Sequence, residues 1–515
     1  MNIYISKNEK ILFVSNIILE PYVKNTFTSD KIVKFIPYEE YLAKENVGYI
    51  KNFQHIIVII NFDLMFNNVI NDLLEHTKSR IELKNEIVEK CQMIYDSIKS
   101  ITDAHIMWFG FENYYCSLNK VLGNIPFLGS FVDEINHCFS RKVCESDVFI
   151  DMKHLIAEIG IQKSFDIKGK YRWNAPYSQL LVNEICGEID KQIAIDKGIT
   201  KKCIVLDCDN VLWGGILSED GFEGVNIGNF GLGKQFYDLQ IFLLHLYYRG
   251  VILAVCSKND YEDVLKMFCE HSGMVLKKEH IACFCVNWNN KVDNIIEISK
   301  KLNIGLNSVV FIDDSYFETN LVKSQLPEVT TIQYDYKTIY EDLSCFNISS
   351  EFNLKETILR HNTYKTDEIR ESLKLQYKSY DEYLKALDMK INIKIASFDE
   401  ISRISELTKR TNKFTNGKRY TSEEIKRLMI KSDYKLYSVY LSDKFSDFGL
   451  VGVIGIENNI LDLLSLSCRA LGRSVEDEMF SLINLNNVVG FCFYPTGKNS
   501  DLHGKMEKFI KDNIN

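Results

Sequence analysis

Short apolar runs alternate with longer amphipathic stretches over the first part of the chain. The runs at residues 11–15, 56–62 and 105–111 have the length and composition of β-strands, whereas residues 80–100 and 178–195 repeat their hydrophobic positions at helical spacing. Strands that alternate with helices are typical of a parallel α/β domain. The pattern therefore predicts such a domain over residues 1–198, closed by the helix that starts near Ser178.

A second region repeats one arrangement four times. Apolar runs at 203–207, 251–257, 281–286 and 308–314 are each followed by polar residues and then by a helical stretch. This order predicts a Rossmann-like domain with a parallel sheet over residues 199–350. Ligands bind beyond the C-terminal ends of the strands in such a sheet, which is where this region places its Asp, Ser and Lys residues.

The remainder of the chain changes pattern again. Residues 351–388 are charged and carry apolar residues at helical spacing, which predicts a helical connector. Further on, helices are predicted at 399–410, at 422–430 and from Gly472, and strands at 391–396, 436–441, 449–457, 460–467 and 488–494. Several of these strands follow one another directly, so we predict an α+β domain with a central antiparallel sheet over residues 389–515.

Composition excludes several classes of function. Hydrophobic residues make up 46% and charged residues 25% of the 515 residues, which is ordinary for a globular chain of several domains. A net charge of −9 and a pI of about 5.7 argue against a nucleic-acid partner. Since no apolar run is long enough to span a membrane and the N-terminus does not resemble a signal peptide, we expect a cytoplasmic protein with no membrane partner.

Cysteines are numerous but show no disulfide or zinc spacing. The chain has fourteen, none in a CxxC pair, and many lie inside apolar runs. We expect reduced thiols in a reducing cytosol, used mostly as small core residues.

Two acidic residues, Asp207 and Asp209, follow the first strand of the second region. Carboxylates two residues apart, where a strand unwinds, can converge on one small volume, as attack beside a metal requires. Asp207 is then the candidate nucleophile, and Asp209 the candidate that moves a proton to the leaving group and back. By itself such a pair is more often a strand-end loop with two exposed acids.

Other polar positions follow the later strands of this region. The Ser257 hydroxyl can bind a phosphoryl group, although a helix N-cap is the commoner role for such a serine. Lys291 can neutralise charge that spreads onto phosphate oxygens, although a lysine there is usually solvated. The acidic pair Asp313 and Asp314 suits a hard cation with oxygen ligands, which predicts Mg²⁺.

The order of these motifs is more specific than any one of them. Asp-x-Asp, Ser, Lys and Asp-Asp follow one another, each at the C-terminal end of a predicted strand. The set resembles the ordered signature of the haloacid dehalogenase superfamily. It predicts a phosphoryl-transfer enzyme whose metal ligands are Asp207, Asp209, Asp313 and Asp314.

A longer resemblance covers nearly the whole chain. Residues 203–221, 287–291 and 308–318 resemble the FkbH-like proteins, which belong to haloacid dehalogenase subfamily IIIC and serve polyketide pathways. The segments 14–21 and 173–179 look like that family's SGNH-hydrolase-like N-terminal domain, and 407–425 and 465–477 look like its GNAT-like acyltransferase module. Ser15 is the only residue with a hydroxyl group in the segment 14–17, and no Asp-x-x-His sequence occurs near residues 170–180. We therefore expect the N-terminal domain to be non-catalytic.

The resemblance implies that the substrate is D-1,3-bisphosphoglycerate. Its glyceryl group passes to an enzyme cysteine with loss of one phosphate, and the haloacid dehalogenase site removes the other phosphate. The phosphopantetheine arm of an acyl carrier protein takes the product. By the same resemblance, the substrate and phosphate contacts are Trp213, Gly214, Gly215, Ser257, Lys258 and Lys291.

Two cysteines compete for the acyl-transfer role. Cys208 stands between the two aspartates, although a residue next to a strand end usually points away from its neighbours, and carboxylates raise a thiol pKa. Cys468 precedes a segment that resembles the Arg-x-x-Gly-x-Gly/Ala turn of pantetheine sites. We favour Cys208 because the substrate phosphates must bind beside it, and a core role stays open for both. The predicted pantetheine contacts are Arg469, Gly472, Arg473 and Ser474.

Two other functions stay open. A phosphatase of another small phosphorylated metabolite would release phosphate without any acylated protein. A non-catalytic binding protein could keep the same fold, but the intact set of Asp207, Asp209, Ser257, Lys291 and Asp313 argues against it. The order of dephosphorylation and acyl transfer and the oligomeric state are also open at this stage.

Overall fold

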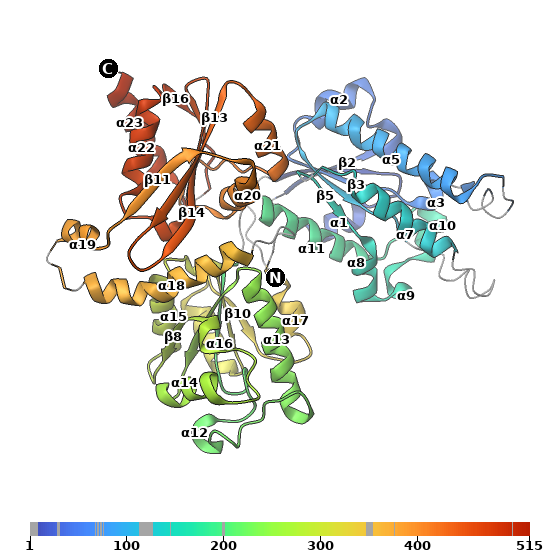
Figure 1. Cartoon of the computed structure of the whole chain (residues 1–515). Coiled ribbons are helices and arrows are strands. Elements are labelled where there is room, and N and C mark those ends of the chain that lie inside the picture. Colours follow the sequence, from blue (N-terminus) through green and yellow to red (C-terminus); the bar gives the residue numbers. More distant parts are fainter. Residues whose placement is uncertain are drawn as a thin grey trace. The chain divides into compact units, whose positions relative to one another are not determined.

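A computed structural model describes most of the chain, and its secondary structure falls into two compact units (Figure 1). The first unit is residues 1–194 and the second is residues 195–515. The predicted class, a multidomain α/β chain with parallel sheets, is confirmed. The residues left undescribed are 1–8, 28–30, 67, 70, 71, 73, 74, 76, 113–126, 145, 198–200, 347–353, 375, 378, 497 and 515.

The first unit is built on a parallel sheet of five strands in the order β2-β1-β3-β4-β5. Its core follows from alternation along each strand: Ile11 and Phe13 of β1 face one hydrophobic cluster, and Leu12 and Val14 face the other. The strands are β1 (Glu9–Ser15), β2 (Lys31–Pro37), β3 (His55–Ile59), β4 (His105–Phe109) and β5 (Val148–Ile150).

Helices cover both faces of this sheet. The buried residues of α5 (Arg80–Ile101) and α7 (Phe127–Ser140) belong to one hydrophobic cluster, and those of α1 (Glu20–Thr26), α8 (Met152–Ile159) and α11 (Gln179–Asp196) to the other. The long α5 begins where a capping box predicts, since Ser79 and Glu82 exchange hydrogen bonds. The short helices are α2 (Lys44–Ile50), α3 (Phe62–Met65), α9 (Ile161–Ser164) and α10 (Ile167–Trp173).

A second parallel sheet opens the second unit, with its strands in the order β10-β9-β6-β7-β8. One face packs against α13 (Lys234–Tyr248) and α14 (Tyr261–Glu270), and the other against α15 (Lys291–Lys301) and α16 (Tyr316–Gln325). Four of the strands were predicted; β10, short and half-buried, was not. The strands are β6 (Cys203–Leu206), β7 (Ile252–Ser257), β8 (Ile281–Val286), β9 (Val309–Asp313) and β10 (Thr330–Gln333).

Helices α18 (Leu354–Lys374) and α19 (Tyr380–Ala386) lead into a third, largely antiparallel sheet. Its strands are β11 (Lys390–Ile395), β12 (Phe414–Thr415), β13 (Tyr434–Ser442), β14 (Asp447–Glu457), β15 (Ile460–Leu466) and β16 (Gly490–Phe491). Helices α20 (Ile401–Arg410), α21 (Ser422–Ile430), α22 (Val475–Leu485) and α23 (Ser500–Ile514) accompany them. The strand predicted at 488–494 is shorter than expected, because only two residues pair with β15, in parallel.

Two of the three predicted domain boundaries lie outside the described residues, since 198–200 and 347–353 are not described. The third, between residues 388 and 389, lies just before β11 and stays a prediction. The twelve cysteines that are described all carry free thiols. Among the described helices, none combines the length and the apolar character needed to cross a bilayer.

Candidate active site

The candidate site lies at the C-terminal edge of the second parallel sheet. Asp207 follows β6, Ser257 ends β7, Asp313 ends β9, and Lys291 opens α15 after β8. Because β9, β6, β7 and β8 are neighbours in the sheet, their C-terminal ends meet at one edge. The structure therefore brings together the residues that the ordered motif predicted.

Lys291 is the centre of this constellation. Its Nζ lies 2.9 Å from Oδ2 of Asp207 and 2.6 Å from Oδ2 of Asp313. All three residues are buried, with Lys291 only 4% exposed. Burial opposes the charged ammonium, but the two carboxylates outweigh it and raise the pKa of Lys291, which stays protonated. One cation is thus held between the candidate nucleophile and an acidic neighbour.

The site also fits a divalent cation. Carboxylate oxygens of Asp207, Asp313 and Asp314 lie within 4.8 Å of one another. Oδ1 of Asp207 is buried and has no hydrogen-bond partner, so one oxygen is left for a metal. Burial, and then the Asp207 carboxylate, raise the pKa of both Asp313 and Asp314. Since Lys291 alone does not neutralise three converging carboxylates, their oxygens form a donor set for a hard cation such as Mg²⁺.

Asp209 is oriented by three donors. Its Oδ1 accepts hydrogen bonds from Trp213 Nε1 at 2.9 Å and from the Leu217 amide at 3.2 Å. Its Oδ2 accepts one from Asn259 Nδ2 at 2.9 Å. The Asp209 side chain is not among the three clustered carboxylates, and its predicted role as a metal ligand stays a prediction. A carboxylate fixed beside the nucleophile still suits proton transfer.

The Trp-Gly-Gly turn of residues 213–215 packs beside Asp209 and supports its position. Trp213 is fully buried and donates to Asp209, and its predicted substrate contact stays a prediction. A Cβ on Gly214 would lie 2.6 Å from the Phe236 ring, so this glycine is needed for packing. Gly215 has a φ of +102°, which only glycine adopts without strain, and its amide donates to Asn210. The glycines therefore shape the turn that holds Asp209.

The residues that follow β7 divide into two roles. The Ser257 side chain is buried, and its Oγ accepts a hydrogen bond from Asn259 Nδ2 at 3.2 Å. Lys258 instead pairs with Glu318 at 2.6 Å, and its side chain is 38% exposed. Ser257 thus lies with the catalytic residues as predicted, whereas Lys258 is engaged by Glu318 at the edge of the site.

Two asparagines of the site were not predicted from the sequence. Asn259 bridges Ser257 and Asp209, and Asn210 accepts from the Gly215 amide and lowers the pKa of Asp314 against the effect of burial. Asn210 also has a φ of +56°, in the left-handed region that asparagine tolerates. In the sequence, the only indication of these roles is position: Asn210 comes one residue after Asp209, and Asn259 comes two residues after Ser257.

Cys208 packs in the hydrophobic core and lies against Ser257 of the candidate site. The side chain is fully buried and belongs to the hydrophobic cluster beneath α13 and α14. Burial, and then the Asp207 carboxylate, raise the pKa of the Cys208 thiol, with Ser257 and Lys291 opposing. A buried thiol of high pKa is a poor nucleophile. Its burial and its neighbouring carboxylate thus weigh against Cys208 as the acyl-transfer thiol, and the choice between the two cysteines stays a prediction.

Cys468 lies at the other edge of the same sheet. It is near Lys202, the residue before β6, whose pKa burial lowers to about 8 while the Cys468 thiolate opposes that shift. The Cys468 carbonyl accepts a hydrogen bond from Asn303 Nδ2 at 2.7 Å. Lys202 and Asp207 mark opposite ends of β6, roughly 16 Å apart at about 3.3 Å per residue. Cys468 is thus partly exposed near cations but remote from Asp207.

The predicted pantetheine turn connects Cys468 to α22. Arg469 is 7% exposed, and the Arg473 guanidinium packs 4.8 Å from the Phe448 ring centre. Gly472 and Ser474 have left-handed φ angles of +73° and +60°. Because both arginines turn inward, the loop does not display the cationic phosphate cradle that the motif suggested.

In the first unit, Ser15 is the last residue of β1. Its Oγ accepts a hydrogen bond from the Ile17 amide at 3.1 Å. Nearby, Asn61 donates to the buried carboxyl of Glu112, and burial raises the pKa of Glu112 to about 7. The expectation that this domain is non-catalytic stays a prediction.

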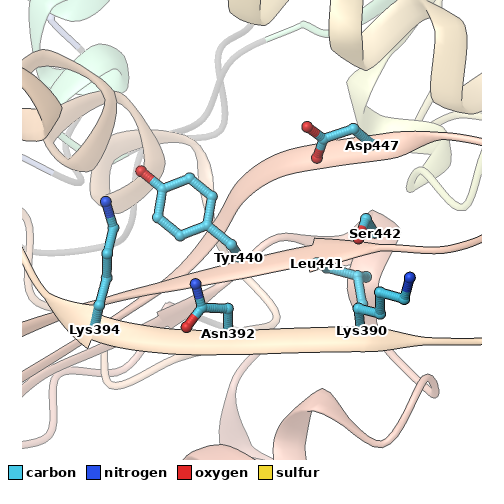
Figure 2. Close-up of a pocket in the computed structure, with 7 residues that line it drawn as sticks. All are labelled: Lys390, Asn392, Lys394, Tyr440, Leu441, Ser442 and Asp447. Atoms are coloured by element: carbon cyan, nitrogen blue, oxygen red, sulfur yellow. The ribbon is translucent and has the colours of Figure 1, made fainter.

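A hollow lined by polar side chains lies on the third sheet (Figure 2). Its polar side chains share one face because they alternate along β11 and β13, where Asn392 pairs with Tyr440 and Lys390 with Ser442. Lys394 is bonded to the Glu400 carboxylate at 2.8 Å, so part of this positive charge is already neutralised. We assign no chemistry to this face.

No family model and no curated protein matches the chain. Among solved structures, the chain is similar to the N-terminal part of the protein BF1531 from Bacteroides fragilis, described as containing a phosphatase domain complexed with Mg. The identity is 24% and the TM-score 0.55, over 68% of this chain and 94% of that chain.

Two weaker similarities support no conclusion. The lipase Lip_vut3 from a goat rumen metagenome has 12% identity and a TM-score of 0.26, over 35% of this chain and 96% of that chain. An uncharacterized protein from Corynebacterium glutamicum has 11% identity and a TM-score of 0.21, over 29% of this chain and 98% of that chain. The similarity to BF1531 shows a shared fold.

Proposed function

We propose that the protein is a Mg²⁺-dependent phosphatase of the haloacid dehalogenase type, with Asp207 as its nucleophile. The observation that carries this proposal is the contact of Lys291 Nζ with both Asp207 and Asp313, beside an Asp207 oxygen with no hydrogen-bond partner. Ion pairs that serve only stability do not need a third clustered carboxylate such as Asp314. The Mg²⁺ bound to the BF1531 phosphatase domain supports the choice of metal.

The residues divide the reaction into two displacements. Asp207 attacks phosphorus and forms an aspartyl-phosphate, while Asp209 gives a proton to the leaving oxygen. Asp209 then takes a proton from the water that hydrolyses this intermediate. Lys291 and the Ser257 hydroxyl hold the phosphoryl oxygens as their charge grows. When bound by Asp207, Asp313 and Asp314, Mg²⁺ supplies further positive charge to this oxygen-rich site.

For the finer activity, we propose that the enzyme is an FkbH-like glyceryltransferase/phosphatase. It uses D-1,3-bisphosphoglycerate and delivers the glyceryl group to the phosphopantetheine arm of an acyl carrier protein. The resemblance of residues 203–221 and 465–477 to that family supports this proposal. A thiolate attacks the acyl phosphate carbonyl, so that the C–S bond forms as the C–O bond breaks and phosphate leaves with the electron pair.

Cys468 is the better candidate for that thiolate. Cys468 is partly exposed and lies near Lys202 and Lys498. Cys208 is fully enclosed in the core. The many free thiols agree with the reducing cytoplasm that we propose as the site of action.

Phosphate release with and without Mg²⁺ tests the phosphatase. In the Asp207→Asn variant, the rate of phosphate release from phosphoglycerate should fall at least a thousandfold, because the nucleophile is lost. The matched control is Asp238→Asn, which removes an exposed carboxylate paired with Lys234 on α13. Equal activity of the two variants would refute the assignment of Asp207.

Intact-protein mass spectrometry with 1,3-bisphosphoglycerate, Mg²⁺ and a phosphopantetheinylated carrier protein tests acyl transfer. We expect a glyceryl-sized adduct that maps to Cys468, is absent in Cys468→Ala, persists in Cys208→Ala and moves to the carrier. Release of phosphate with both proteins unmodified would instead favour the second candidate, a phosphatase of another small phosphorylated metabolite.

A further inference from the structure

Two imidazoles and two carboxylates gather at one edge of the first parallel sheet. A ring nitrogen of His55, a ring nitrogen of His105 and a carboxylate oxygen of Asp196 all lie within 4.8 Å of one another. The second carboxylate is that of Glu9, whose Oε2 lies 3.2 Å from His55 Nε2. We call these four residues the histidine cluster. Nitrogen and oxygen donors that converge in this way are typical of a metal site.

The strand register places three of these side chains at the N-terminal edge of the sheet. His55 opens β3 and His105 opens β4, and the two residues are directly paired across these neighbouring strands. Their ring centroids lie 6.1 Å apart. Glu9 opens β1, which is the other neighbour of β3. The histidine cluster therefore lies at the edge opposite to the one where Ser15 ends β1.

Strand alternation turns these three side chains toward one face of the sheet. The residues two positions further along each strand point the same way, and they belong to the hydrophobic cluster that also holds the buried residues of α11: Ile11, Ile57 and Met107. Asp196 is the last residue of that helix. The helix that covers this face thus brings the fourth side chain to the other three.

The backbone beneath the histidine cluster is held by Gln54, the residue before β3. Its amide donates to the Lys10 carbonyl at 3.1 Å, and its Oε1 accepts from the Lys10 amide at 3.0 Å. Its carbonyl accepts from the His105 amide at 3.0 Å. The starts of β1, β3 and β4 are therefore fixed by contacts that do not use the side chains of the cluster. Ligands held in place before binding cost a metal site less to assemble.

Glu9 determines which nitrogen of His55 can reach a metal. Because Nε2 lies within hydrogen-bond distance of the Glu9 carboxylate, His55 offers Nδ1 to the other donor atoms. A carboxylate on the second nitrogen of a metal-bound histidine fixes the ring and raises its basicity. His55 is 6% exposed and Glu9 is 3% exposed, so this contact is shielded from water. Glu9 is thus placed to orient His55.

The donor set favours Zn²⁺ over Mg²⁺. Imidazole nitrogens suit Zn²⁺, whereas Mg²⁺ prefers oxygen ligands and keeps several waters. When both imidazoles are neutral, the Glu9 and Asp196 carboxylates are the charged groups of the cluster, and a divalent cation balances them. Bonds of about 2.0–2.1 Å put the ligands of a tetrahedral zinc ion about 3.3 Å apart. Modest side-chain rotations therefore bring the three donor atoms into place.

We propose that Zn²⁺ binds to Nδ1 of His55, a ring nitrogen of His105 and the Asp196 carboxylate, with Glu9 orienting His55. These residues stand far apart in the sequence, at the starts of β1, β3 and β4 and at the end of α11. A metal that joins them closes long loops of the chain and stabilises the folded state. The site is structural and separate from phosphoryl transfer, because its ligands come from the first parallel sheet and the helix that covers it.

Zinc titration of the metal-free full-length chain, with excess Mg²⁺ present for the carboxylates of the candidate active site, tests this proposal. Calorimetry should show a zinc site with a Kd of about 1 μM or lower. At a hundredfold excess of free Zn²⁺ over that Kd, the midpoint of thermal unfolding should rise by about 5 °C or more. His105→Gln and Asp196→Asn should each weaken this site at least a hundredfold, and Glu9→Gln about ten- to a hundredfold.

The matched control is His137→Gln, which removes an exposed histidine on α7 and should bind zinc like the wild type. His105 is only partly buried, so its variant should keep the fold, which the unfolding midpoint without metal checks. Wild-type binding weaker than about 1 μM, or a site that persists unchanged in His105→Gln and Asp196→Asn, would overturn the proposal. The four residues would then form an ion-pair network without a metal.

Discussion

Replacing Lys291 by Met should leave the candidate site with an uncompensated negative charge. The ammonium group bonds Asp207 at 2.9 Å and Asp313 at 2.6 Å, and all three residues are buried. Breaking a buried ion pair by removal of one partner costs about 3–5 kcal/mol. We therefore expect the metal-free variant to lose about 3–5 kcal/mol of unfolding free energy in urea, because its carboxylates repel one another.

Mg²⁺ should reverse part of that loss, since a divalent cation bound to the same carboxylates restores the missing positive charge. Phosphate release should still fall by about a hundred- to a thousandfold, the usual effect of losing one charge-stabilising group. The control Lys234→Met removes an exposed pair with Asp238 and should cost less than about 1 kcal/mol. A metal-free Lys291→Met protein as stable as the wild type would refute this account of the site.

Three further outcomes follow from particular contacts. Trp213→Phe keeps the buried ring but removes the hydrogen bond to Asp209, so kcat should fall about tenfold or more with little change in KM, measured by steady-state phosphate release. Gly215→Ala introduces a Cβ 2.4 Å from Asp220 Oδ2 at a φ of +102°, and thermal unfolding should show a loss of about 1–3 kcal/mol. Burial raises the pKa of Glu112 from its ordinary value of 4.5 to about 7, so the folded state binds the proton more tightly than the unfolded state. The unfolding free energy of the first unit should therefore fall by up to about 3 kcal/mol as pH rises from 4.5 to 7, and Glu112→Gln should remove that slope in urea titrations.

The strands that carry the site could be predicted because each is a continuous apolar run. Residues 251–257 and 281–286 are buried on both faces of a parallel sheet, which leaves a clear signal in the sequence. β10 has no such signal, since two of its four residues are only partly buried. β12 is two residues long and pairs only at the edge of β15. Short edge strands depend on a partner that is distant in sequence.

The supporting residues of the site could not be identified in the same way. Asn259 is one of many asparagines, and its role depends on Asp209 lying across the edge between β6 and β7. Trp213 beside two glycines suggested contact with substrate, yet the packing of Phe236 and α13 encloses it. The direction in which such a side chain points depends on the side chains that pack over the turn. Those side chains come from elements that are distant in the sequence.

By itself, the sequence determined the α/β class and the set formed by Asp207, Lys291 and Asp313, because strand ends in a parallel sheet meet at one edge whatever covers it. Only the tertiary structure shows how the surroundings of the two candidate cysteines differ. It turned Cys208 into the core and placed Cys468 at the opposite edge from Asp207. The two-residue repeat of a strand determines which side chains share a face of the sheet. The burial and ionisation of a side chain depend on neighbours that only folding brings together.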